Sequence, residues 1–267
     1  MIAASAPAPV LEFAGDAMIG IVGGAGPFAG VDLARKICEE TLAHRDQDHL
    51  PFALLSTPER ISDRTAFLLG EQGDNPGEAI AEVVLALERL GCTAVGLPCH
   101  TAHAPPILGA MNAALARHST KVRFVNMVEE TARYLGERVA PNTKIGVLST
   151  VGTQRAVIYP AALGGAGFAV VTLPEPRLDE LVHRAIYDPA DGIKVTGAPV
   201  SERVRRDVMQ AITELRVAGA EAVVLGCTEL PLAVPEAELD GLPIVDPTRI
   251  LARALIRAVT PARLRIR

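Results

Sequence analysis

Aromatic side chains are scarce in this chain of 267 residues: they make up 3% of the sequence, and tryptophan is absent. So few rings argue against a platform on which nucleobases or sugars stack. The net charge of −5 also argues against a basic surface for nucleic acid. Residues 92–116 hold no Asp, Glu, Lys or Arg, but Pro98, Pro105 and Pro106 interrupt this run, so it is not a membrane span. We therefore expect neither nucleic acid nor a membrane as a partner.

Cysteine is scarce as well, with four in the chain and no Cys-x-x-Cys pair. Four scattered cysteines do not make a disulfide framework, and without that pair a zinc ribbon is not expected. The pattern favours a reduced protein in the cytoplasm. Residues 1–17 are rich in Ala and Pro but lack the basic start of a signal peptide, so we expect a flexible leader there.

The most informative feature that is present is an internal repeat. Gly91 and Gly219 each end a predicted helix, a short apolar strand follows, and the next turn carries Cys99 or Cys227. The cysteines lie 128 positions apart (227 − 99), and so do the glycines (219 − 91). This repeat indicates two similar domains that face each other across a cleft, with one thiol from each side.

Short β-branched runs alternate with longer helical patterns, which predicts an α/β fold with parallel sheets. We expect strands at 18–22, 52–56, 93–97, 122–125, 144–148, 169–173, 222–225 and 244–245. We expect helices at 27–43, 76–90, 105–117, 129–138, 153–162, 179–187, 202–218 and 248–258. The first predicted domain comprises 18–119 and 243–267 and carries Cys99, whereas the second comprises 120–242 and carries Cys227. In this division the C-terminal helix crosses back to complete the first domain.

In open α/β sheets, ligands bind beyond the carboxyl ends of the strands, and both repeated cysteines fall there. Each also precedes a predicted helix start, where the helix dipole favours a thiolate. One thiolate that removes a proton and one thiol that supplies a proton, on opposite faces of a carbon, are what a racemase needs. The alternative is a small buried core residue, the usual place of a free cysteine, and we assign it to Cys38 and Cys92.

Four motifs carry a resemblance to a known family: Gly-Ile-Val-Gly-Gly-Ala-Gly-Pro at 20–27, Asp-Arg-Thr-Ala-Phe at 63–67, Pro-Cys-His-Thr-Ala-His at 98–103 and Gly-Cys-Thr-Glu at 226–229. In these the chain resembles the aspartate/glutamate racemase family. Arg-Asp-Gln-Asp-His at 45–49 is similar to the aspartate racemase branch. The resemblance implies two flavodoxin-like domains related by a pseudo-twofold axis, an active site in the cleft between them and often a homodimer. It also implies racemisation of aspartate or glutamate without a cofactor.

The resemblance assigns roles to individual residues. It makes Cys99 and Cys227 the catalytic pair, and it implies that Thr101 and Thr228 hold the substrate α-carboxylate. It implies that Arg64 grips a substrate carboxylate. Further candidates for substrate binding are Lys194, for which a solvated lysine is the alternative, and Gly24, whose loop would let backbone amides approach a carboxylate.

The chain departs from the family pattern at His100, where Asn is usual, and at Ala25, where a bulkier residue is usual. His100 is a candidate for binding a carboxylate or for changing the pKa of the neighbouring thiol. His103 either acts chemically or orders the loop, and Glu229 either tunes Cys227 or caps a helix. Cys99, His100 and His103 lack a second matching cluster, so we expect no metal.

Two alternatives stay open at this point, and a third is disfavoured. Another reaction of the same superfamily, of the hydantoin racemase, maleate isomerase or arylmalonate decarboxylase type, would use the same fold. A binding protein whose cleft holds a carboxylate would do no chemistry. A nucleotide-binding dehydrogenase is disfavoured because the glycines at 24, 26 and 30 have the wrong spacing for a dinucleotide fingerprint.

Overall fold

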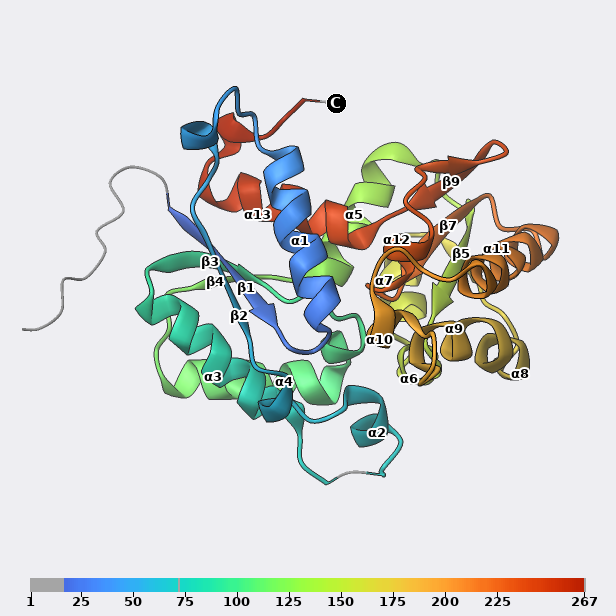
Figure 1. The fold of residues 1–267 in the computed structure, drawn as a ribbon, viewed down its shortest axis with the longest axis horizontal. Coiled ribbons are helices and arrows are strands. Elements are labelled where there is room, and N and C mark those ends of the chain that lie inside the picture. Colours follow the sequence, from blue (N-terminus) through green and yellow to red (C-terminus); the bar gives the residue numbers. More distant parts are fainter. Residues whose placement is uncertain (1–16, 72, 267) are drawn as a thin grey trace, which may run out of the picture.

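The computed structural model describes residues 17–71 and 73–266. The leader expected at 1–17 lies outside the described residues, apart from Ala17. The chain forms two α/β halves, drawn at the left and the right of Figure 1. Each half is built on its own sheet.

The two sheets have the same strand order. The first runs β2-β1-β3-β4 and the second β6-β5-β7-β9, all parallel, and β8 adds an antiparallel edge to the second. The register repeats too, because Ile19 lies opposite Ala94 and Ile145 lies opposite Ala222. The predicted α/β fold with two parallel-sheet domains is therefore confirmed. The strands of the first sheet are β1 (Met18–Gly23), β2 (Phe52–Ser56), β3 (Cys92–Gly96) and β4 (Arg123–Val125). The others are β5 (Lys144–Ser149), β6 (Ala169–Val171), β7 (Ala222–Gly226), β8 (Glu238–Leu239) and β9 (Leu242–Val245).

Helices cover both faces of each sheet. In the first half they are α1 (Pro27–Glu40), α2 (Arg64–Leu68), α3 (Pro76–Arg89), α4 (Pro105–Arg117) and α5 (Met127–Arg138). In the second they are α6 (Val151–Arg155), α7 (Ile158–Gly165), α8 (Glu175–Leu178), α9 (Arg184–Tyr187), α10 (Ile193–Thr196), α11 (Glu202–Val217) and α12 (Leu230–Ala233). The last helix, α13 (Pro247–Val259), follows the second sheet in the chain but packs on the first. A π-helical turn, Asp179–His183, joins α8 to α9. Figure 1 shows α3 and α4 on one face of the first sheet and α1 and α13 on the other.

Two strands belong to a different sheet from the one predicted from the sequence. β4 was expected in the second domain, but it pairs with β3 of the first sheet. Most of β9 was expected in the first domain, but it pairs with β7 of the second sheet. These two assignments were wrong because strand pairing is a long-range contact, which the local apolar pattern of a short strand does not specify.

Each sheet's last strand leads into a helix with the same kind of cap. Asn126 follows β4 and accepts hydrogen bonds from the amides of Val128 and Glu129, at the start of α5. Asp246 follows β9 and accepts from two amides at the start of α13 in the same way. Such caps satisfy helix amides that have no partner within the helix, so they fix where each helix begins. α13 then packs on α1 and β3 of the first half, whereas α5 packs on α13 and on α7 of the second.

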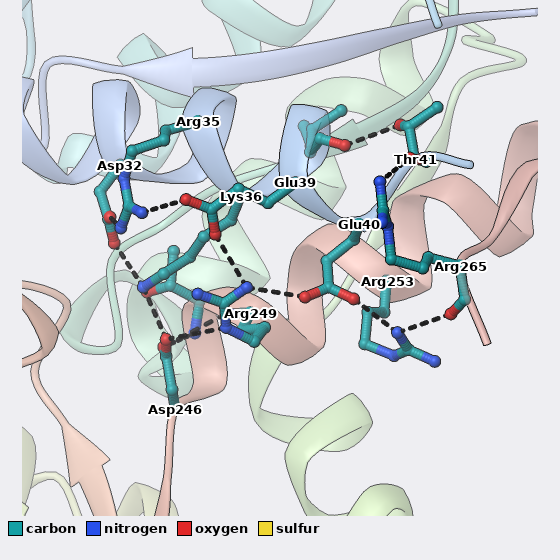
Figure 2. Close-up of polar contacts among 12 residues, drawn as sticks. Asp32, Arg35, Lys36, Glu39, Glu40, Thr41, Asp246, Arg249, Arg253 and Arg265 are labelled. Atoms are coloured by element: carbon teal, nitrogen blue, oxygen red, sulfur yellow. Dashed lines mark hydrogen bonds and ion pairs between the residues drawn. The ribbon is translucent and has the colours of Figure 1, made fainter. Parts of the chain in front are cut away.

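A buried ion network fastens α13 to α1 (Figure 2). The Lys36 ammonium lies 2.5 Å from Asp32 Oδ2 and 2.6 Å from Asp246 Oδ2, and only 1% of the residue is exposed. Next to it, the fully buried Glu40 receives Arg249 and Arg253. Because Asp246 is the residue at which the chain leaves the second sheet, this network ties the crossover point to the first half.

The halves also share one hydrophobic core. Ala222 and Val224 on one face of β7 belong to the same apolar cluster as Ile19 and Ile21 of β1. Val223, on the other face of β7, packs into a separate cluster with α11. This alternation is that of a strand buried on both faces. The shared cluster holds the carboxyl ends of β3 and β7 close together.

One predicted helix is interrupted. The helix expected at 153–162 divides into α6 and α7 at Val157, which has φ +53°. A β-branched residue rarely adopts this left-handed conformation, so the pattern of apolar residues gave no sign of the break. The interruption places Tyr159 in the first turn of α7, where it faces the first half.

Candidate active site

Cys99 and Cys227 line one cavity between the two halves. Cys227 directly follows β7, and Cys99 follows β3 after two further residues. The cavity is lined by Ala25, Arg64, Thr65, Cys99, His100, Thr101, Thr150, Tyr187, Lys194, Cys227, Thr228 and Glu229. Its volume is about 10 Å³, which is room for about one water molecule. Both thiols are therefore enclosed together, with 8% of Cys99 and 7% of Cys227 exposed.

The Cys227 thiol faces a carboxylate. Its Sγ donates to Glu229 Oε2 at 2.9 Å, and Lys194 Nζ donates to Glu229 Oε1 at 3.0 Å. Burial, and then the charge of Glu229, raise the pKa of Cys227 well above its usual range. Although burial alone would raise the pKa of Glu229, the Lys194 ammonium holds it below its usual range. At neutral pH this arrangement favours a protonated thiol beside an ionised carboxylate.

The Cys99 thiol faces a cation. Burial works against the charged form of Arg64, but interaction with Cys99 is the strongest of the contacts that raise the pKa of its guanidinium. Arg64 is 7% exposed and donates to three backbone carbonyls, those of Ala25, Ile61 and Ser62. Among the residues that the structure describes, it forms no ion pair with a carboxylate, and its Nε has no hydrogen-bond partner. A buried cation without an anion is costly, so this site favours an anionic ligand.

His103 holds the loop that carries Cys99 in place through two hydrogen bonds. Its Nδ1 lies 2.8 Å from the Cys99 carbonyl, and its Nε2 accepts from the Met127 amide at 3.4 Å. Since Nε2 accepts, Nδ1 carries the proton and donates to Cys99. Burial lowers the pKa of His103 to about 4, so the ring is neutral at neutral pH. His103 does not line the cavity, and of its two expected roles the contacts support ordering of the loop.

His100 lies in the cavity wall. Its Nδ1 is 2.8 Å from the Tyr159 hydroxyl, which reaches it from α7 of the second half. Burial lowers the pKa of His100 to about 3, so this ring too is neutral. Its Nε2 is buried and has no hydrogen-bond partner among the described residues.

The glycine loop after β1 is shaped by close backbone contacts. Gly24 has φ +90°, and a Cβ there would lie 2.8 Å from the Thr57 amide nitrogen. A Cβ at Gly26 would lie 2.5 Å from Glu229 Oε1. Gly24 is not among the residues that line the cavity, whereas the neighbouring Ala25 is. The loop thus lets the first half approach Glu229 of the second half.

Three comparisons identify what the chain is similar to. The family model for Asp/Glu/Hydantoin racemase matches residues 22–255. The chain belongs to the Asp/Glu/hydantoin racemase family. The broad specificity amino-acid racemase RacX of Bacillus subtilis is 25% identical over 246 residues, which cover 90% of this chain and 96% of that protein. A glutamate racemase of Listeria monocytogenes is 32% identical over 110 residues, which cover 39% of this chain and 37% of that one. The solved structure of Picrophilus torridus aspartate racemase has a TM-score of 0.74 at 28% identity and covers 91% of this chain and 94% of that one.

In this member of the Asp/Glu/hydantoin racemase family, two hydrogen bonds of threonine hydroxyls connect the halves around the cavity, Thr101 with Thr153 and Thr228 with Pro98. Thr101 Oγ1 lies 2.8 Å from Thr153 Oγ1, and Thr150 Oγ1 donates to Thr153 at 3.1 Å. Thr228 Oγ1 lies 3.3 Å from both the Pro98 carbonyl and Glu229 Oε2. Thr101 and Thr228, the two threonines expected to bind substrate, therefore both lie at the site.

Sequence reasoning missed Thr65, Thr150, Tyr159 and Tyr187. Thr150 could have been found from the repeat, because it stands 126 positions after Gly24 (150 − 24), the spacing between β1 and β5. The one sequence signal that could have pointed to the tyrosines was their rarity, since the chain has only three. Tyr187 lines the cavity, and its ring centre lies 5.4 Å from Lys194 Nζ.

Two further findings hold for residues 17–71 and 73–266. No helix in these ranges is long and apolar enough to cross a membrane. They also contain no group of three or more His, Cys, Asp or Glu placed to hold a metal ion.

Proposed function

We propose that the protein racemises an acidic amino acid, aspartate or glutamate, with Cys99 and Cys227 as the two bases. The observation that carries this proposal is that both thiols line one cavity and have partners of opposite charge. The Arg64 guanidinium interacts with Cys99, whereas the Cys227 thiol donates to the Glu229 carboxylate. We therefore assign the role of first base to Cys99 and that of acid to Cys227, as a two-base reaction requires.

Each proton has a definite donor and acceptor in this mechanism. In one direction the Cys99 thiolate takes the α-proton, and the electron pair of the C–H bond stays on the α-carbon. The Cys227 thiol then gives its proton to the opposite face of that carbon, which inverts the centre. Cys99 is left as a thiol and Cys227 as a thiolate, so the reverse reaction starts from this form.

The cations support an acidic substrate. Arg64 is buried without a carboxylate partner among the described residues, and a substrate carboxylate would compensate its charge. Lys194 contributes a second cation on the same side, because its Nζ lies 3.5 Å from the Ala25 carbonyl to which Arg64 also donates. Hydroxyls of Thr101 and Thr228 would hold the other carboxylate.

Substrate entry needs a more open form. A cavity of about 10 Å³ holds no amino acid. Thr65 of α2 and Gly152 of α6 touch across the halves, since a Cβ at Gly152 would lie 2.6 Å from Thr65 Oγ1. We propose that such contacts part when substrate enters and close again to exclude water during proton transfer. From the sequence we keep the proposals of a homodimer that works in the cytoplasm without a cofactor.

The experiment is a screen of L- and D-amino acids in heavy water, read by loss of the α-proton signal and by optical rotation. We expect exchange and inversion with aspartate or glutamate, and a loss of at least about 100-fold for Cys99→Ser and for Cys227→Ser. Cys38→Ser, at a half-buried position on α1, is the matched control and should keep full activity. Undiminished turnover in both site variants would refute the two-thiol mechanism. Binding of an acidic amino acid without exchange would identify a carboxylate-binding protein instead.

A further inference from the structure

Thr153 contacts the site from outside the cavity wall. It belongs to α6 of the second half, is 2% exposed and does not line the cavity. Its Oγ1 lies 2.8 Å from Oγ1 of Thr101, which lines the cavity from the first half. The Thr150 hydroxyl donates to Thr153 at 3.1 Å. Three hydroxyls from the two halves therefore form one hydrogen-bonded chain, from Thr150 through Thr153 to Thr101.

A bound carboxylate sets the direction of this chain. An ionised carboxylate only accepts hydrogen bonds, and a threonine hydroxyl has a single proton to donate. Thr101 can therefore donate to a carboxylate and keep its bond to Thr153 only if Thr153 is the donor in that bond. Thr153 can donate, because the bond from Thr150 uses the Thr150 proton. Among the described residues, Oγ1 of Thr153 has no hydrogen-bond partner besides these two hydroxyls.

Thr228, the other threonine expected at the carboxylate, has a different environment. Its hydroxyl lies 3.3 Å from the Pro98 carbonyl and 3.3 Å from Glu229 Oε2. Both partners are acceptors, so the one proton of Thr228 already points to one of them. A substrate carboxylate has to replace such a bond at Thr228, whereas Thr101 can donate its proton without losing a hydrogen bond.

We propose that Thr153 is a positioning residue for substrate binding: its hydroxyl donates to Thr101 and so directs the Thr101 proton to the substrate α-carboxylate. This rests on the proposed function and deepens it. Because Thr153 and Thr101 belong to different halves, the donor is set only when the halves are closed. Next to Thr153, Gly152 packs so tightly on Thr65 of α2 that a Cβ would lie 2.6 Å from its Oγ1. Closure of α6 on the first half and binding of the carboxylate are therefore coupled.

The test changes one hydroxyl and compares two ligands. Thr153→Val removes the hydroxyl at nearly constant volume, whereas Thr153→Ser keeps it. The ligands are L-aspartate and β-alanine, which is aspartate without its α-carboxylate, or L-glutamate and 4-aminobutyrate, whichever acid the enzyme racemises. KM and kcat are measured for the amino acid, and the inhibition constant for its shorter analogue.

We expect Thr153→Val to raise KM for the amino acid about fivefold to tenfold, with a smaller change in kcat, because an oriented hydrogen bond to a carboxylate is lost. Inhibition by the analogue should change less than about twofold, and Thr153→Ser should restore KM to within about twofold of the wild type. Thr41→Val is the matched control, because it removes another buried hydroxyl, one that donates to the Ile37 carbonyl of α1, and it should change neither ligand.

Each outcome decides. If Thr153→Val binds the amino acid as well as the wild type does, or better, Thr153 does not direct the Thr101 proton, and the proposal is overturned while the racemase reaction stands. Equal weakening of both ligands, or a loss that Thr153→Ser does not restore, shows a structural role alone and also overturns it. A wild type that racemises no acidic amino acid overturns the proposed function and this inference together. If Thr153→Val does not fold, Thr153→Ala takes its place, and the same comparison with Thr153→Ser decides.

Discussion

Replacing Glu229 by glutamine should lower the pH at which the Cys227 thiol ionises. Oε2 of Glu229 lies 2.9 Å from Sγ of Cys227, so a thiolate there meets a negative charge at hydrogen-bond distance. Two unit charges about 4 Å apart interact by about 4 kcal/mol at an effective dielectric constant of 20, which equals about three pH units. Glutamine keeps an acceptor for the thiol but removes the charge. Lys194, freed from its ion pair, would then also favour the thiolate.

The measurement is a titration of thiolate by ultraviolet absorbance in a Cys99→Ser background, where the other site thiol is absent. The ionisation midpoint of Cys227 should move down by about two to three pH units in Glu229→Gln. Glu236→Gln removes a carboxylate from a more exposed pair with Arg205 and should leave the midpoint in place. An unchanged midpoint in Glu229→Gln would show that burial alone governs Cys227, and the proposed division into acid and base would lose its basis.

Three further predictions concern stability and fit. Both histidines of the Cys99 loop have pKa values lowered from 6.5, to about 3 and about 4. The unfolded chain therefore binds more protons below pH 6.5, and urea unfolding should show stability falling from there toward pH 4 by up to about 1.4 kcal/mol per pH unit for each ring; a flat profile would contradict this. Gly26→Ala, whose Cβ would lie 2.5 Å from Glu229 Oε1, should cut racemase activity at least about tenfold, whereas Gly109→Ala, which meets nothing within 4 Å, should not. Lys36→Met leaves the buried Asp32 and the half-buried Asp246 without their shared cation and should cost about 3 to 5 kcal/mol in urea unfolding; a loss below about 1 kcal/mol would show that the network does not fasten α13.

The sequence was sufficient for features that depend on neighbours in the chain. Proline at the first position and an amide cap before it fix where α3 begins, and α4 was predicted over its full length. The 128-residue repeat of Cys99 and Cys227 predicted two similar halves with their thiols at corresponding turns. Each strand-turn-helix unit is encoded within about 40 consecutive residues, so its pattern can be recognised from the sequence alone.

The partner of each site residue was decided only by the tertiary structure. Nothing in the spacing indicated that Arg64 lies beside Cys99, that Glu229 receives Lys194, or that Tyr159 reaches His100 from the other half. The exchange of β4 and β9 between the expected domains has the same origin. Local propensity sets the element, but contacts between residues far apart in the chain set its neighbours, and the ionisation of the two thiols depends on those neighbours.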